Sequence, residues 1–181
     1  METITQDFLR EVTLENHQEF YDLMWRIYPP EYAHFWKNED CTFYINNQFS
    51  KETLSKELKE KQLYYFVVEN NENVGILRLK FDEFPNKTID ATRVIKLHRI
   101  YLDPKVQGKG LGTKTLNFID EVARLNNYKY IWLNAMLDKP SAVSFYLKNG
   151  YKVFDMYHYD FDLIKPELRQ MMAFGKEVFN S

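Results

Sequence analysis

The apolar and polar positions of this chain change their period along its length, which predicts a succession of strands and helices. Residues 64–69 and 74–81 alternate as strands do and predict a hairpin through the polar residues 70–73. Residues 93–102 are a longer strand-like run, and residues 114–126 follow a helical period. The apolar face of that helix is formed by Leu111, Leu116, Ile119, Val122 and Leu125.

The amino-terminal third is predicted to hold one strand and two helices. Residues 4–12 are the strand, and Thr13 is a candidate N-cap for a helix that ends at Pro29-Pro30. An irregular aromatic stretch follows, after which Ser50 caps a shorter helix through Lys61.

The last third is predicted to continue with two strands, residues 130–134 and 151–161, and a second helix between them. Gly150 is a candidate C-cap of that helix. Periodicity does not decide the structure of the segment from Leu168 onward.

Half of the six glycines, Gly108, Gly110 and Gly112, fall within five residues between the 93–102 strand and the following helix. Glycine adopts positive φ and lets its N–H group approach a ligand closely. A helix that begins behind such a turn adds N–H donors and the positive end of its dipole, so the segment can hold a pyrophosphate. The alternative is a strand-to-helix turn that binds nothing.

Two nucleotide-binding motifs do not fit this loop. A Walker loop needs Ser or Thr directly after Gly-Lys, and here Gly110 follows Lys109. The dinucleotide fingerprint G-x-G-x-x-G needs glycine at Thr113 and normally opens its domain.

The loop instead resembles the pyrophosphate loop Q/R-x-x-G-x-G/A of the GNAT N-acetyltransferases, with Gln107, Gly110 and Gly112 in register. The strand at 96–104 resembles the family's pantetheine-binding strand, and residues 141–151 resemble its A-x-x-F-Y-x-x-x-G-[FY] helix and turn. Within the family, the sequence of these segments most resembles bacterial PaiA-type polyamine acetyltransferases.

The resemblance implies the GNAT fold, an α/β (α+β) architecture. Its mixed, mostly antiparallel central sheet has about six to seven strands, is flanked by helices, and is splayed at the strand before the CoA loop. The segment from Leu168 is then the last strand. The implied activity is acetyl-CoA-dependent transfer to a primary amine, a polyamine or another small-molecule amine, in a ternary complex. Two alternatives stay open: a CoA-binding regulatory or interaction module without turnover, and acetylation of a protein N-terminus or an amino acid.

The resemblance also assigns residues to the binding of acetyl-CoA. Asn134 stands where another branch has a glutamate base; an amide cannot accept the proton, so it is expected to bind the pantetheine or the acceptor amide. Lys139 is expected to reach a CoA phosphate or to be merely solvated. The complete expected set is Ile100, Tyr101, Leu102, Gln107, Gly108, Lys109, Gly110, Leu111, Gly112, Thr113, Asn134, Lys139 and Tyr146.

Two residues are candidates for catalysis. Tyr146 resembles the general acid of many GNATs, and a phenol pKa of about 10 lies near that of a thiol; the alternative is a packed core aromatic. His98 resembles a base that acts on the amine through water, and the alternative is a structural histidine. PaiA-type relatives tend to have glutamates where Lys96 and His98 stand, so polyamine specificity is open.

The acceptor side is assigned by hypothesis to the segment around Pro29-Pro30. Cationic amines need carboxylates or aromatic faces nearby. That segment offers both, unless its aromatic residues are simply core: Glu31, Tyr32, Trp36, Asp40 and Tyr44.

Composition agrees with this interpretation. The length of 181 residues suits a single domain spanning 1–181, and the net charge of −2 gives no basic field for nucleic acid. The lone Cys41 excludes an intrachain disulfide and suits a reducing compartment. No secretion signal or long apolar stretch is evident, so we expect a cytoplasmic protein without membrane contact or a bound metal. A homodimer stays open.

Overall fold

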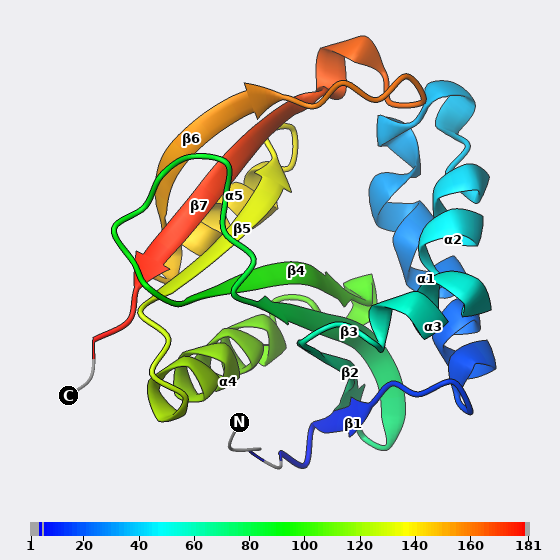
Figure 1. Cartoon of the computed structure of the whole chain (residues 1–181). Helices are drawn as coiled ribbons and strands as arrows, with labels where there is room; N and C mark the ends of the chain where they lie inside the picture. Colours follow the sequence, from blue (N-terminus) through cyan, green and yellow to red (C-terminus); the bar gives the residue numbers. More distant parts are fainter. Residues whose placement is uncertain (1–3, 5, 180–181) are drawn as a thin grey trace. The chain divides into compact units, whose positions relative to one another are not determined.

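The structure is a computed structural model that describes residue 4 and residues 6–179 of the chain. Its described strands form a seven-stranded sheet in the order β1-β2-β3-β4-β5-β7-β6 (Figure 1). The strands β1–β2–β3 and β5–β7–β6 are antiparallel, whereas β4 and β5 are parallel. The expected α/β fold, with a mixed and mostly antiparallel sheet flanked by helices, is therefore confirmed.

The described chain consists of two compact units. The amino-terminal unit comprises residues 6–80 and 99–112, and the carboxy-terminal unit comprises residues 4, 81–98 and 113–179. Strand β4 (Val94–Leu102) thus contributes its first half to one unit and its second half to the other. The single domain expected over residues 1–181 stays a prediction.

The helices and strands of the amino-terminal unit come from both of its chain segments. They are β1 (Leu9–Glu11), α1 (His17–Tyr32), η1 (Ala33–Phe35), η2 (Lys37–Glu39), α2 (Thr42–Gln48), α3 (Lys51–Glu57), β2 (Gln62–Glu69), β3 (Glu72–Phe81), the end of β4 and η3 (Pro104–Val106).

An aromatic core joins the helices of this unit to its hairpin. Phe20 of α1 is fully buried and packs edge-on against Phe49, Tyr64 and Phe66, with ring centroids 5.3–6.3 Å apart. The hairpin turns tightly at Asn70-Asn71, where both residues have positive φ as a type I′ turn requires. The predicted hairpin is confirmed with a shorter turn than expected.

Helix α1 differs from its prediction at both ends. Thr13 is not its N-cap: the backbone N–H of Thr13 donates to the Asn16 side chain at 2.8 Å, so that turn precedes the helix, which begins at His17. The helix also passes through Pro29-Pro30 to Tyr32. Proline removes N–H donors, but the N–H of Ala33 still reaches the carbonyl of Pro29, and the last turn survives.

The region after α1 contains a helix that periodicity missed. Residues expected to be irregular form α2, an apolar and amide-rich segment too short to show a clear helical period. Ser50 does cap the next helix, since its side chain accepts from the N–H of Thr53 at 3.1 Å. That helix, α3, ends at Glu57, four residues before the predicted Lys61.

The carboxy-terminal unit contains the start of β4, α4 (Leu111–Leu125, from Thr113 onward), β5 (Tyr130–Met136), α5 (Pro140–Lys148), β6 (Lys152–His158), η4 (Pro166–Leu168) and β7 (Gln170–Glu177). The segment after Leu168 is thus the expected last strand. Gly150 follows α5 with φ +84°, as a helix C-terminus with a left-handed residue requires. Among the described helices, none combines the length and apolar character needed to cross a membrane.

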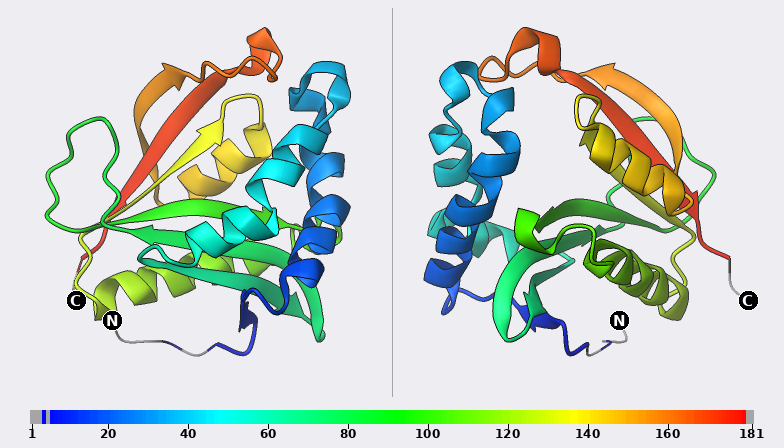
Figure 2. Two further views of the ribbon diagram at one scale, coloured as in Figure 1. Left: turned by 45° about the vertical axis from the view of Figure 1, so that its right-hand side comes forward. Right: turned by 180° about the vertical axis from the view of Figure 1, so that it is seen from behind.

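The two faces of the β5–β7–β6 sheet are covered differently. Tyr146 of α5 contacts Phe174 of β7, with ring centroids 5.6 Å apart, so α5 covers that face. The loop 82–93 lies on the opposite face, where Trp132 Nε1 donates to the carbonyl of Glu83 at 2.7 Å. Figures 1 and 2 show the helix and the loop on opposite sides of these strands.

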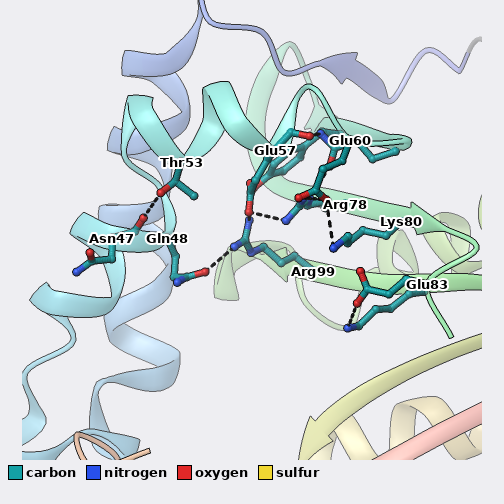
Figure 3. Close-up of polar contacts among 12 residues, drawn as sticks. Asn47, Gln48, Thr53, Glu57, Glu60, Arg78, Lys80, Glu83 and Arg99 are labelled. Atoms are coloured by element: carbon teal, nitrogen blue, oxygen red, sulfur yellow. Dashed lines mark hydrogen bonds and ion pairs between the residues drawn. The ribbon is translucent and has the colours of Figure 1, made fainter. Parts of the chain in front are cut away.

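A buried ion network joins α3 to three strands of the amino-terminal unit (Figure 3). Arg99 Nη1 of β4 donates to both carboxylate oxygens of Glu57 at 2.9 Å, and Arg78 of β3 donates to the same carboxylate. Arg99 also donates to the hydroxyl of Tyr64 at 3.0 Å and to Gln48 Oε1 at 2.9 Å. Burial raises the pKa of Tyr64 to about 12, so its hydroxyl stays neutral and accepts from Arg99.

We expect Glu57→Gln to lower the free energy of unfolding by about 3–5 kcal/mol, because it leaves two buried guanidinium groups without their shared anion. Urea denaturation at neutral pH measures the loss. Glu60→Gln is the matched control: Glu60 also pairs with Arg78, but its side chain is 43% exposed. Glu60→Gln should lower the free energy of unfolding by no more than about 1 kcal/mol. A similar small cost for Glu57→Gln would contradict the assigned role of the network.

Candidate active site

The glycine loop of the amino-terminal unit has the backbone conformation that a ligand cradle needs. Gly108 and Gly110 have φ of +76° and +85°, and a Cβ built at either position meets no atom within 4 Å. Helix α4 begins at Leu111, three residues before the predicted start at residue 114. Gly112 therefore lies in the first helical turn rather than in the loop. The loop thus opens directly onto the N-terminus of a 15-residue helix.

The end of β4 leads into this loop with its side chains alternating. Arg99 and Tyr101 point toward the helices α1–α3: Arg99 donates to Gln48, and the hydroxyl of Tyr101 lies 3.1 Å from that of Tyr44. Ile100 and Leu102 consequently point the other way. Gln107 Nε2 donates back to the carbonyl of Leu102 at 3.4 Å. The side chain that matches the first position of the pyrophosphate motif thus holds the loop against its own strand.

Most of the segment assigned to the acceptor side belongs to a packed aromatic cluster. The Tyr28 ring stacks between Tyr32 and Tyr44, at centroid distances of 4.7 and 4.8 Å, and its hydroxyl accepts from Trp36 Nε1 at 3.3 Å. Tyr101 meets the Tyr28 ring edge-on at 5.4 Å. Both faces of Tyr28 are covered by protein, so any contact with an acceptor must come from the rim of this cluster.

The two carboxylates of that segment lie outside the stack. Glu31 is half-buried and Asp40 is exposed. Asp40 accepts from the backbone N–H of Thr42 at 2.9 Å, and hydrogen bonds from Thr42 lower the pKa of Asp40. Asp40 therefore stays ionised, and its interaction with an acceptor stays a prediction.

In the carboxy-terminal unit, the strands β4 and β5 part after a short pairing. The parallel register joins Val94–Lys96 to Tyr130–Trp132 and goes no further along these strands (Figure 1). The expected splay of the sheet at the strand before the CoA loop is therefore present. His98 and Asn134 each follow the last pair, Lys96 and Trp132, by two residues.

His98 and Asn134 lie on the same face of the splayed strands. Lys96 Nζ sits 4.6 Å from the ring centroid of Trp132, so this last pair shares a face, and alternation places the residues two positions later on that face too. The Oδ1 atom of Asn134 is buried and accepts no hydrogen bond within the described structure. A buried amide oxygen without a donor is costly, and ligand binding by Asn134 stays a prediction.

Tyr146 lies on the opposite face. It is buried and contacts Phe174, which pairs with Leu133 across β5 and β7, and alternation turns Leu133 away from the side of Trp132 and Asn134. Burial raises the pKa of Tyr146, so its phenol stays protonated over the whole physiological range. The residue can hold a proton, and its role as an acid stays a prediction.

Lys139 stands at the start of α5, where its carbonyl accepts from the N–H groups of Ala142 and Val143. Its side chain is half-buried, and its expected contact with a CoA phosphate stays a prediction. Sequence reasoning missed the buried network of Glu57 and Arg78 behind Arg99. Arg78 lies inside an apolar strand segment, but Glu57 stands in a run of charged residues, so the sequence does not tell which partners they meet.

The chain was compared with known proteins by family, sequence and structure. Residues 17–151 match the acetyltransferase (GNAT) family. An uncharacterized N-acetyltransferase of Lactobacillus delbrueckii subsp. lactis is 26% identical over 113 residues, which is 62% of this chain and 65% of that protein. The match thus spans slightly less than two thirds of that curated relative.

Solved structures show the same fold. PaiA N-acetyltransferase from Thermoplasma acidophilum, in complex with coenzyme A, is 19% identical with a TM-score of 0.69, covering 93% of this chain and 97% of that one. The ribosomal-protein-S18-alanine N-acetyltransferase of Escherichia coli is 14% identical with a TM-score of 0.67, covering 96% and 94%. With the family match over residues 17–151, the chain belongs to the GNAT acetyltransferase family.

Proposed function

We propose that this protein is an acetyl-CoA-dependent N-acetyltransferase that transfers an acetyl group to a primary amine by direct attack in a ternary complex. The observation that carries the proposal is the loop at Gly108 and Gly110, whose left-handed backbone and open surroundings precede the N-terminus of α4. Acetyl-CoA, when bound, supplies the acetyl group as an activated thioester. The residues of the chain then have to bind this cofactor and orient the acceptor. They also have to take one proton from the amine and give one proton to the departing sulfur.

The proposed cofactor contacts follow the chain from β4 into α4. Backbone groups of Ile100, Tyr101 and Leu102 pair with the pantetheine amides. The backbone N–H groups from Gln107 through Thr113, including those of Lys109 and Leu111, hold the pyrophosphate at the positive end of the helix dipole. The buried Oδ1 of Asn134 accepts a hydrogen bond from an amide N–H, and Lys139 neutralises a phosphate. Both glycine conformations and the orphaned amide oxygen fit a ligand of this chemistry.

Tyr146 is the proposed general acid. Its buried phenol keeps a proton ready for the departing sulfur, because burial raises the pKa of Tyr146. The raised pKa also makes the phenol a weaker acid than it is in water. The same exclusion of water disfavours a free thiolate. Proton transfer therefore depends on the difference between the pKa of the phenol and the pKa of the thiol.

His98 is the proposed base. It shares a face of the splayed strands with Asn134, while Tyr146 lies on the other face. This arrangement separates the group that takes a proton from the amine and the group that gives one to the sulfur. In this assignment His98 would take the proton that the amine loses, and Tyr146 would supply the proton that the sulfur gains.

The acceptor is proposed to be a small-molecule amine. Lys96, which stands where PaiA-type relatives tend to have a glutamate, pairs with Glu83, so the positive charge that it adds is compensated. A polyamine therefore remains a suitable acceptor. Two solved relatives of similar TM-score carry different names, PaiA and S18-alanine N-acetyltransferase, so the fold by itself does not select the acceptor. A panel of polyamines, amino acids, aminoglycosides and peptide N-termini, read by thiol release, identifies it.

The competing function is a CoA-binding module without turnover. The observation that favours it is the amide of Asn134 where another branch of the family has a glutamate base. Thiol release from acetyl-CoA with any member of the acceptor panel supports the enzyme. Binding of acetyl-CoA without thiol release across the whole panel supports the module.

The cofactor site is tested with Gly110→Ala. We expect the affinity for CoA to fall by at least about tenfold, since the left-handed backbone that aims the N–H groups is lost and charge-assisted bonds go with it. Isothermal titration calorimetry measures the change. Gly150→Ala is the matched control, because Gly150 has almost the same φ, +84°, outside the loop. Unchanged CoA affinity in folded Gly110→Ala would end the phosphate-cradle assignment.

The acid is tested with Tyr146→Phe, which removes one hydroxyl and keeps the ring packed against Phe174. We expect kcat to fall by about 10²-fold or more, the usual scale of general acid catalysis, with CoA affinity little changed. Steady-state kinetics with the best acceptor of the panel measures it. Tyr151→Phe, a neighbouring buried tyrosine, is the control and should keep its kcat. Near-wild-type turnover in Tyr146→Phe reduces that residue to a packing role.

The base is tested through the pH dependence of kcat. If neutral His98 takes the proton, activity is lost as the pH falls and the imidazole becomes protonated. His98→Ala should then lower kcat and remove this acidic break from the pH profile. The exposed His158 offers a control, since His158→Ala should keep both the rate and the break. An acidic limb that does not move in His98→Ala makes His98 structural.

A further inference from the structure

One buried carboxylate, that of Asp103, holds the start of the glycine loop in place through hydrogen bonds and an ion pair. Asp103 is 7% exposed and follows the last residue of β4. Its backbone N–H donates to the carbonyl of Val74 at 2.7 Å. Its Oδ1 accepts from the N–H of Lys105 at 3.0 Å, which caps η3, and its Oδ2 lies 3.4 Å from Arg26 Nε. Asp103 is therefore bound to β3, to η3 and to α1 at once.

Arg26 extends this arrangement from the side of α1. Its Nη2 donates to the carbonyl of Asn73 at 2.6 Å, while its Nε faces Asp103. The Arg26 side chain is 52% exposed, so the ion pair by itself adds little stability. Its effect is geometric, because a single planar guanidinium sets the distance between the start of β3 and the start of the loop.

Strand β3 also packs closely against the end of β4, just before the loop. A Cβ built on Gly75 would lie 2.5 Å from the carbonyl oxygen of Tyr101, so the two backbones approach closely there. By contrast, residues 107–110 are exposed, and Cβ atoms at Gly108 and Gly110 would meet nothing within 4 Å. The loop is thus rigidly held where it leaves β4 and free of steric contacts at its two left-handed glycines.

We propose that Asp103, together with Arg26, is a positioning residue for the 107–110 loop, an inference that rests on the proposed binding of CoA by that loop. The carboxylate touches no ligand. It fixes the direction in which the chain leaves β4 through η3, so that the N–H groups of the loop are preorganised before CoA arrives. Loss of this fastening adds an ordering cost to every binding event, which lowers affinity without changing the reacting groups.

The test measures the Kd for CoA by calorimetry in three single variants and one double variant, at a temperature where each is folded. Asp103→Ala removes the cap and the ion pair, and we expect its Kd to rise about fivefold, the scale of a lost helix cap. Asp103→Asn keeps an oxygen for the N–H of Lys105, and Arg26→Gln keeps the whole cap. Each of these should raise Kd by about two- to threefold, as loss of a partly exposed ion pair allows. The double variant Asp103→Asn/Arg26→Gln should be no weaker than the worse single variant, because both remove the same contact.

Acetyl-CoA kinetics adds a readout that a purely structural role does not move: KM for acetyl-CoA should rise while kcat stays within about twofold. Arg10→Gln is the control, since it breaks the exposed Arg10–Glu19 pair between β1 and α1 and should leave Kd unchanged. If the variants lose thermal stability but bind CoA as the wild type does, Asp103 is merely structural and the inference is overturned. If Asp103→Ala does not fold, the other two variants decide. A wild-type protein that does not bind CoA overturns the proposed function as well.

Discussion

The early end of the parallel pairing between β4 and β5 is the constraint on which the candidate active site depends. Only Val94–Lys96 pair with Tyr130–Trp132, and from there the two strands diverge. The divergence lets His98 and Asn134 follow the last pair on one face without a neighbouring strand between them, while Tyr146 approaches the other face from α5. A longer pairing would instead continue the hydrogen-bonded ladder along both strands.

Strand β4 can diverge because its second half is held by other means. In the amino-terminal unit, Arg99 and Arg78 share the buried carboxylate of Glu57, and Asp103 joins the strand end to β3 and α1. These contacts replace what a further neighbour on the splayed side would supply. The cost is a buried ion network whose partners must all be present, since an unpaired buried guanidinium is strongly destabilising. Alternation along β4 thus places Arg99 and Tyr101 on the side of these structural contacts and turns Ile100 and Leu102 to the other side.

Sequence reasoning located the elements with strong local signals. The hairpin before Phe81, the last strand after Leu168 and the C-cap at Gly150 follow from alternation, from family resemblance and from glycine chemistry. It failed where a local rule competed with context. Pro29-Pro30 did not end α1, because the carbonyl of Pro29 still receives the N–H of Ala33. Seven residues from Thr42 to Gln48 formed a helix although their apolar side chains follow no clear period.

By itself the sequence determined the family motif, whose residues are neighbours in the chain, and the fold class followed from the resemblance that this motif carries. It placed three glycines together, whereas the structure separates Gly108 and Gly110, with positive φ, from Gly112 in the first turn of α4. Only the tertiary structure decided that Asn134 carries a buried oxygen without a donor and that Tyr146 lies on the face opposite His98. It alone showed that Glu57 forms ion pairs with both Arg78 and Arg99 and that Asp103 forms one with Arg26. The physical reason is range: backbone conformation is set by local sterics, whereas the environment of a side chain is set by strand register and by packing between distant segments.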